Sequence, residues 1–124
     1  MSPTSAALMI RIVGVISLIT AIVFSLAGVN DFTGGNEIFF QLASSGGNGV
    51  AGLDSAEAKL AMAIAGGIFA GFAAFYIFIT APGVEQGNEM IRKGSIYAFL
   101  IWYLVDGAAS VLSGNAVNLS LIHI

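Results

Sequence analysis

Three long apolar segments constrain the fold of this chain more than any other feature. They lie at about residues 12–29, 60–81 and 94–113. Each is close to the roughly 20 mostly apolar residues that a helix needs to cross a hydrocarbon core about 30 Å thick. The whole chain is 57% hydrophobic and 9% charged, whereas soluble domains have roughly 25% charged residues. The pattern predicts an all-α, polytopic transmembrane bundle that is surrounded by the lipid bilayer and forms one domain over residues 1–118.

The residues that flank these segments indicate where helices begin and end. The second segment follows Asp54 and Glu57, which are spaced like an N-terminal capping box, and it stops at Pro82. The loop before it contains a Gly-rich run, residues 44–54, that is typical of a flexible connector. Earlier in the same loop, the sequence NEIFFQLA at residues 36–43 predicts a short amphipathic helix that packs against the mouth of the bundle.

The basic residues predict the orientation, because Lys and Arg near the ends of spans are retained on the cytoplasmic side. Arg11 precedes the first segment, and Arg92 and Lys93 precede the third, whereas Lys59 alone lies in the long first loop. This distribution predicts a cytoplasmic N-terminus. In an alternative interpretation the first segment is a cleaved signal sequence with a small-residue site before Gly28, although its apolar run exceeds the roughly 7 to 15 residues of such signals.

The reactive side chains form no catalytic or metal-binding pattern. The chain has no cysteine and one histidine, His123, so thiolate chemistry and Cys-ligated metals are excluded. The acids of the first loop have no metal-ligand spacing, and solvation and capping explain them; they are Asp31, Glu37, Asp54 and Glu57. Basic residues are not clustered, as nucleic-acid binding would require. We therefore expect no enzyme, no cofactor, no metal and no nucleic-acid partner.

Small residues recur along the first two segments at helical spacing. The second segment has the row Ala63, Gly67 and Gly71 beside the row Gly66, Ala70 and Ala74, and the first segment has Ser17, Ala21 and Ser25. Such rows let helix backbones approach closely in lipid. We expect them to pack against each other within one chain. The alternative is that the smooth face of the second segment joins two copies in a homo-oligomer or contacts a membrane partner protein.

Asp106 interrupts the third segment. It lies thirteen residues past Lys93, so at about 1.5 Å per residue it is about 20 Å into the hydrocarbon core. An aspartate there costs roughly 2.5 to 3.5 kcal/mol on insertion scales, so we expect it to face the bundle interior and find a partner, or to be protonated. Lys59 is one candidate partner, and Tyr103 and Ser110 on the same helical face are hydrogen-bond candidates. The acid is either a structural lock between helices or a site for a ligand, ion or proton.

The sequence RKGSIYAFLIWYLVDGAASVLSGNAVN, residues 92–118, resembles the third helix and exit loop of uncharacterised small four-helix bacterial membrane proteins. The shared positions are Trp102, Asp106, Ser110, Gly114 and Asn118. The Gly-rich second segment, AMAIAGGIFAGFAAF, is also similar to theirs. This resemblance implies a bacterial inner membrane protein with a fourth helix after residue 118, and it implies no specific activity.

The last six residues, LSLIHI at 119–124, are too short for that fourth helix. The codons CTG TCT CTT ATA CAC ATC would encode them, and that string matches the end of a widely used transposon-based sequencing adapter. We therefore interpret residues 119–124 as foreign sequence that truncates a fourth span. In the alternative interpretation the six residues are natural, and the chain has three spans and an external C-terminus.

These patterns favour a structural or accessory subunit that acts through helix packing in the membrane. The alternative is a component for small-molecule, ion or proton transport that is centred on Asp106. A transport component predicts a polar cavity that reaches Asp106 between the spans.

Overall fold

The computed structural model describes residues 2–30, 32–44 and 52–118. In chain order its elements are α1 (Pro3–Ala27), α2 (Gly35–Ala43), α3 (Ala56–Phe75), the π-helical turn η1 (Tyr76–Thr80), α4 (Ala81–Glu85) and α5 (Glu89–Leu112). Because α3, η1 and α4 follow one another without a break, residues 56–85 form one long rod. This rod, α1 and α5 are each long and apolar enough to cross a membrane, which confirms the all-α fold with three candidate spans.

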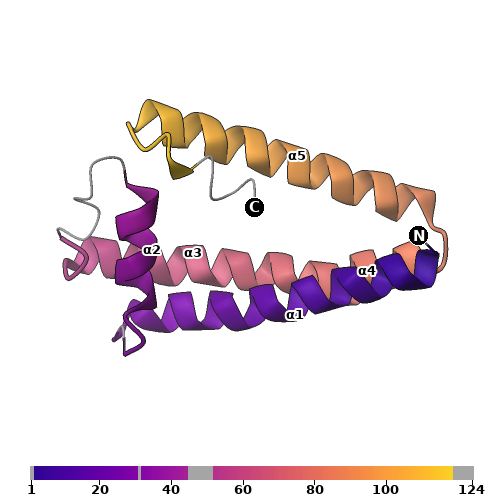
Figure 1. The fold of residues 1–124 in the computed structure, drawn as a ribbon, viewed down its shortest axis with the longest axis horizontal. Coiled ribbons are helices and arrows are strands. Elements are labelled where there is room, and N and C mark those ends of the chain that lie inside the picture. Colours follow the sequence, from indigo (N-terminus) through magenta and orange to yellow (C-terminus); the bar gives the residue numbers. More distant parts are fainter. Residues whose placement is uncertain (1, 31, 45–51, 119–124) are drawn as a thin grey trace.

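The helices are arranged as a hairpin with a third helix attached at one end. Figure 1 shows α1 and α3 side by side and antiparallel, with α5 joined to them near α4 and diverging from them along its length. The short helix α2 lies across the opposite end of the hairpin. The N-terminus lies at the end where α4 meets α5.

Polar side chains start the long helices. The Ser2 hydroxyl accepts a hydrogen bond from the Ser5 amide at 3.2 Å, which starts α1 well before the predicted residue 12. Ser55 caps α3 in the same way, accepting from the Ala58 amide at 3.1 Å. The predicted capping box starting at Asp54 is therefore wrong, and the N-cap is the next residue.

The second long helix also continues past Pro82, where the sequence predicted its end. Proline lacks the N–H that would bond to the carbonyl four residues earlier, and its ring crowds that carbonyl. Just before the proline, one helical turn contains an extra residue. The Ala81 amide there donates to the Tyr76 carbonyl, five residues earlier, in a π-helical bond. The helix thus passes Pro82 with a local distortion and ends at Glu85.

The contact between α1 and α3 depends on small residues, but only some of the predicted ones. Gly66 lies so close to Ser25 that a Cβ added to it would be 2.6 Å from the Ser25 Cβ. Ala21 is fully buried in the same contact surface. Gly67 and Gly71 are exposed, with open space where a Cβ would be added. The expectation that these two glycines pack within the chain is wrong, because the face centred on Gly66 turns them away from α1.

The attachment of α5 is confined to its first two turns. The hydroxyls of Thr80 and Ser95 form a buried hydrogen bond at 3.0 Å. One turn closer to the connection, Ile91 packs so tightly on Gly83 that an added Cβ would approach it to 2.5 Å. Within the described chain, the rest of α5 has no extensive contact with α1 or α3. This one-sided attachment produces the divergence that is visible in Figure 1.

Candidate functional site

A cavity of about 1010 Å³ lies between α5 and the α1–α3 hairpin. Its walls are formed by Ser17, Thr20, Val23 and Phe24 of α1, by six residues of α2 and its end (Gly35, Asn36, Phe39, Phe40, Ala43 and Ser44), by Ala65 and Phe69 of α3, and by Phe99, Trp102, Asp106 and Ser110 of α5 with Ser113, Asn115 and Asn118 beyond it. We refer to it as the interhelical cavity. It reaches Asp106 between the spans, at the position where a transport component would need it.

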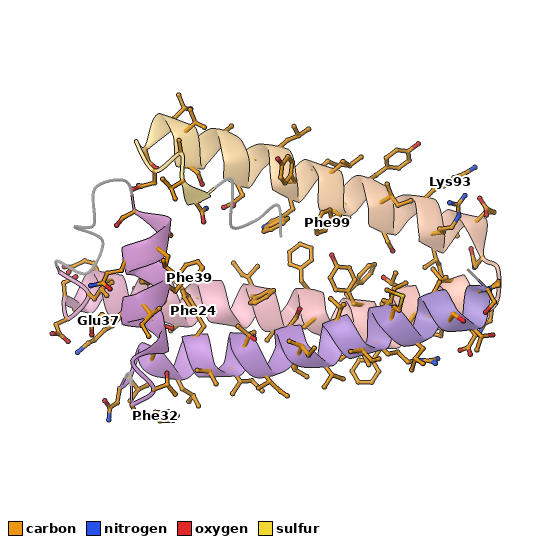
Figure 2. The ribbon with its side chains drawn as sticks, viewed as in Figure 1. Phe24, Phe32, Glu37, Phe39, Lys93 and Phe99 are labelled. Carbon is orange, nitrogen blue, oxygen red and sulfur yellow. The ribbon has the colours of Figure 1, made fainter. Side chains whose placement is uncertain are left out.

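The helix α2 closes one end of the interhelical cavity. The Asn36 side chain is 4% exposed, and its amide donates to the Phe24 carbonyl at 3.3 Å and to the Met62 sulfur at 3.1 Å. Phe39 also packs on the Phe24 ring, with the ring centroids 5.8 Å apart (Figure 2). Phe40 packs on the same ring, with a centroid distance of 5.9 Å. These contacts confirm the predicted helix at the bundle mouth, whereas the burial of Asn36 was not predicted.

A Schellman motif at the end of α5 brings Asn118 back to Asp106. The Asn115 amide donates to the Ser110 carbonyl at 2.8 Å, and the Gly114 amide donates to the Val111 carbonyl at 3.0 Å. Gly114 has a φ of 81°, a left-handed conformation that glycine adopts without the cost of a Cβ. The chain therefore reverses at Gly114 and returns along the cavity side of α5.

Asp106, Ser110 and Asn118 form a polar cluster on the cavity wall. The Asn118 side-chain amide donates to the Ser110 hydroxyl oxygen at 2.9 Å and to an Asp106 carboxylate oxygen at 3.5 Å. The longer contact is at the limit of a hydrogen bond, so it offsets little of the cost of an aspartate in the membrane. Sequence reasoning placed Ser110 beside Asp106 but missed Asn118, because the turn that returns it lies outside the helical spacing.

The predicted partner Lys59 is elsewhere. Its ammonium group lies 3.6 Å from an Asp54 carboxylate oxygen at the start of α3. The expected pair of Lys59 with Asp106 is therefore wrong for this structure, because α5 diverges from α3 at that end of the bundle. Tyr103 lies one turn before Asp106 and is half-buried, but it does not line the interhelical cavity.

Aromatic rings cover the cavity side of α5 next to Asp106. The rings of Phe99 and Trp102 are 5.4 Å apart, and both side chains line the interhelical cavity. Figure 2 shows Phe99 extending from α5 into the space facing the hairpin. On the opposite wall, Phe24 and Phe69 face the same space. The middle aromatic residues of the third span thus line an internal surface.

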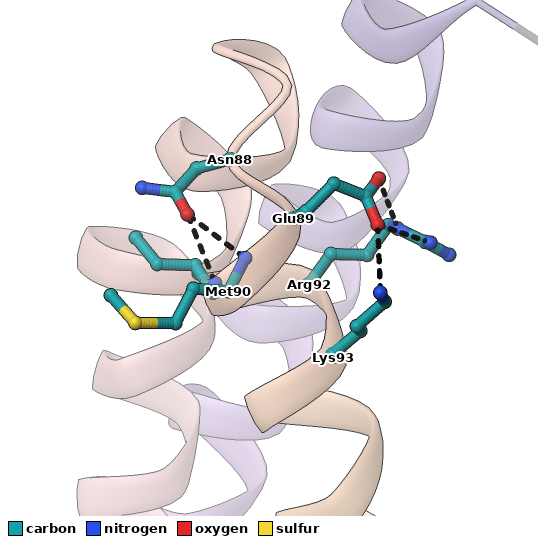
Figure 3. Close-up of polar contacts among 6 residues, drawn as sticks. Asn88, Glu89, Met90, Arg92 and Lys93 are labelled. Carbon is teal, nitrogen blue, oxygen red and sulfur yellow. Dashed lines mark hydrogen bonds and ion pairs between the residues drawn. The ribbon is translucent and has the colours of Figure 1, made fainter.

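All four Lys and Arg side chains of the chain pair with carboxylates other than Asp106. Arg11 contacts Glu85 at 2.6 Å, and Lys59 is paired with Asp54 as described. Figure 3 shows Arg92 and Lys93 both directed to Glu89, with nitrogen–oxygen distances of 2.7 and 3.8 Å. Among residues 2–30, 32–44 and 52–118, no Lys or Arg forms an ion pair with Asp106.

Some predictions concern residues outside the described ranges. These are the role of Asp31, most of the Gly-rich run (residues 45–51), and the foreign-sequence interpretation of residues 119–124 with His123.

A scan of protein-family models and searches of curated proteins and of solved structures found no match to the chain. The resemblance to small four-helix bacterial membrane proteins stays a prediction.

Proposed function

We propose that this integral membrane protein is a small-molecule binding component, centred on the interhelical cavity beside Asp106. The observation that carries the proposal is the cavity itself, at about 1010 Å³, with an acid on its wall. Ligand sites typically have roughly 300 to 1000 Å³ and combine an apolar lining with a few convergent polar groups. The aromatic lining with the cluster of Asp106, Ser110 and Asn118 has this composition. The proposal involves binding without a catalytic step.

We further propose that this binding takes place in a bacterial inner membrane with the N-terminus in the cytoplasm. Arg11, Arg92 and Lys93 support this orientation, because the end of the bundle where α1 begins and α5 starts carries three of the four basic residues. The wide part of the cavity, which holds Asp106 and has α2 at its end, would then lie toward the outer half of the bilayer. Lipophilic molecules that partition into the membrane would reach it from there.

Trp102 allows a direct test, since it is the only tryptophan of the chain and lines the cavity. The protein would be reconstituted in liposomes and titrated with a nitroxide-labelled lipophilic probe that quenches tryptophan fluorescence. Binding in the cavity predicts saturable quenching at a low probe-to-lipid ratio. The matched control is the double variant Trp102→Phe, Leu104→Trp, because Leu104 is 65% exposed on the other side of α5 at a similar depth. That variant should be quenched only in proportion to the probe in the bilayer. Equal, unsaturable quenching of both proteins would contradict the proposal.

A second candidate is the structural or accessory subunit that the sequence favours. The observation in its favour is the exposed position of Gly67 and Gly71, which leaves a smooth stretch of α3 open to another helix. A second copy or a membrane partner protein would use this stretch. Energy transfer between labelled copies in liposomes, compared between the native protein and Gly67→Ile, tests self-association through this face. Co-purification with a membrane protein that Gly67→Ile abolishes would support the partner.

A further inference from the structure

We infer that the molecule that the interhelical cavity takes is a lipophilic organic cation, with an ammonium group beside Asp106 and an apolar body against the aromatic walls. The inference rests on the proposed function, since it names the chemical class of the ligand. It concerns a small molecule that enters from the bilayer.

The charges of the described residues indicate what kind of partner would complete the site. An ionised carboxylate in the membrane interior needs a counter-charge, because desolvation of the lone ion is costly. Each Lys and Arg is engaged with Asp54, Glu85 or Glu89. In the described ranges the Asp106 carboxylate has only the Asn118 amide at 3.5 Å. A positive charge from outside the chain would complete the polar cluster.

The surroundings of Asp106 favour an organic cation over a bare metal ion. Phe99 and Trp102 precede Asp106 by seven and four residues on the same face of α5, and all three line the cavity. Aromatic faces attract ammonium groups, by about 2 kcal/mol or more when the site is desolvated. A hard metal ion instead needs about six oxygen ligands. Among the described residues that line the cavity, Asp106 is the one carboxylate, and no group of acids or histidines that could hold a metal ion surrounds it. The aromatic pair on one side of the acid therefore matches an ammonium group with hydrocarbon substituents better than a bare metal ion.

The position of α2 favours a small molecule over a partner helix. Residues of α2 line one end of the interhelical cavity, and α2 is held there by the Asn36 hydrogen bonds to the Phe24 carbonyl and the Met62 sulfur. A helix that crossed the whole bilayer at this place would have to displace α2, whereas a small molecule would not.

The test compares two probes that differ only in charge. One is a nitroxide-labelled alkyl chain with a trimethylammonium head, and the other carries the isosteric neutral tert-butyl head on the same labelled chain. Both are titrated into liposomes of zwitterionic lipid, and Trp102 quenching reports occupancy. The proteins are the native chain, Asp106→Asn, and the control Glu57→Gln, which removes an exposed acid outside the cavity.

We expect the cationic probe to reach half-maximal quenching of the native protein at about tenfold lower concentration than the neutral probe, as a partly desolvated ion pair predicts. Asp106→Asn should abolish this preference while the neutral probe still quenches it saturably, which shows that the variant is folded. Glu57→Gln should keep the preference.

Equal affinities of the two probes for the native protein would overturn the inference and leave the proposed function standing. A preference that persists in Asp106→Asn would also overturn it. The absence of saturable quenching by either probe would overturn the proposed function together with the inference. If Asp106→Asn binds neither probe, Asp106→Glu, which keeps the charge, must retain the preference for the cation; its loss there counts against the inference.

Discussion

Asn36 joins three helices through one side-chain amide. It belongs to α2, and it donates to a backbone carbonyl of α1 and to the Met62 sulfur of α3. Burial of an amide is costly unless its hydrogen bonds are made, so a residue in this position fixes α2 in one place. Because α2 closes one end of the interhelical cavity, the single residue also affects the shape of the proposed binding site.

Asn36→Ala should therefore loosen α2 and lower stability by about 1–3 kcal/mol. The change in the free energy of unfolding is measured by SDS titration in mixed micelles, and hydrogen exchange of the α2 amides should become faster. Gln41→Ala is the matched control, since Gln41 is exposed on the same helix. Exposed substitutions of this kind change stability by about 0.5 kcal/mol or less. Equal effects of the two substitutions would show that the Asn36 contacts do not hold α2.

Helix α3 presents two neighbouring glycines in opposite environments. Gly66 contacts the backbone and side chain of Ser25 on α1, whereas Gly67, one residue later, faces open space. A helix rotates by about 100° per residue, so adjacent positions point in different directions. The pair thus provides an internal control for the packing of α1 on α3.

Gly66→Ala should destabilise the hairpin by about 1–3 kcal/mol, because the added methyl group overlaps Ser25 and forces the helices apart. Gly67→Ala should be neutral or stabilise the protein by up to about 1 kcal/mol, because alanine favours the helix and meets no atom. Both values follow from SDS titration of the two variants side by side. A larger loss in Gly67→Ala than in Gly66→Ala would reverse the assignment of the packing face.

The lengths of the apolar segments were largely enough to predict the helices of this fold, but not the contacts between the helices. Three blocks of about 20 apolar residues predicted the long helices, and the helical spacing of the apolar residues in NEIFFQLA predicted α2. The sequence offered two adjacent small-residue rows on α3, and α1 packs on Ala63 and Gly66 while Gly67 and Gly71 face away from it. Both rows have the same small-residue spacing, so only the crossing of α1 chooses between them. The end at Pro82 was missed because the π-turn at Tyr76–Thr80 is a local response of the helix.

The sequence identified the central residue of the candidate site, but it did not predict how the other residues are arranged around it. A charge inside an apolar block singles out Asp106, and its helical spacing to Ser110 is fixed. The divergence of α5 follows from its attachment near its start, through Ser95 and Ile91. It leaves the end of α5 that carries Asp106 apart from the Lys59 end of α3. Asn118 reaches the acid only because Gly114 reverses the chain. The first effect is tertiary and the second is a local turn at the end of α5, and neither follows from the apolar periodicity.

At the scale of the whole molecule, one end of the bundle holds the start of α1, the α4–α5 connection and most of the basic residues. The other end holds α2 and the end of α5. This arrangement places the wide part of the interhelical cavity and the α4–α5 connection at opposite ends of the bundle. The orientation therefore decides from which leaflet a ligand would enter.

Cysteine labelling tests the threading, because the chain has no cysteine of its own. Single cysteines at Ser2 and Gln86 should react with a membrane-impermeant maleimide only after the membrane is permeabilised. Cysteines at Gln41 and Val117 should react from outside in intact cells. The basic residues at the Ser2 end predict that this end is cytoplasmic. The three long helices predict that cysteines at Ser2 and Gln86 are labelled from one side of the membrane, and that cysteines at Gln41 and Val117 are labelled from the other side. The reversed labelling pattern would invert the orientation and keep the fold. Opposite labelling of Ser2 and Gln86 would contradict the hairpin of α1 and α3 itself, since that hairpin requires both positions to lie on the same side of the membrane.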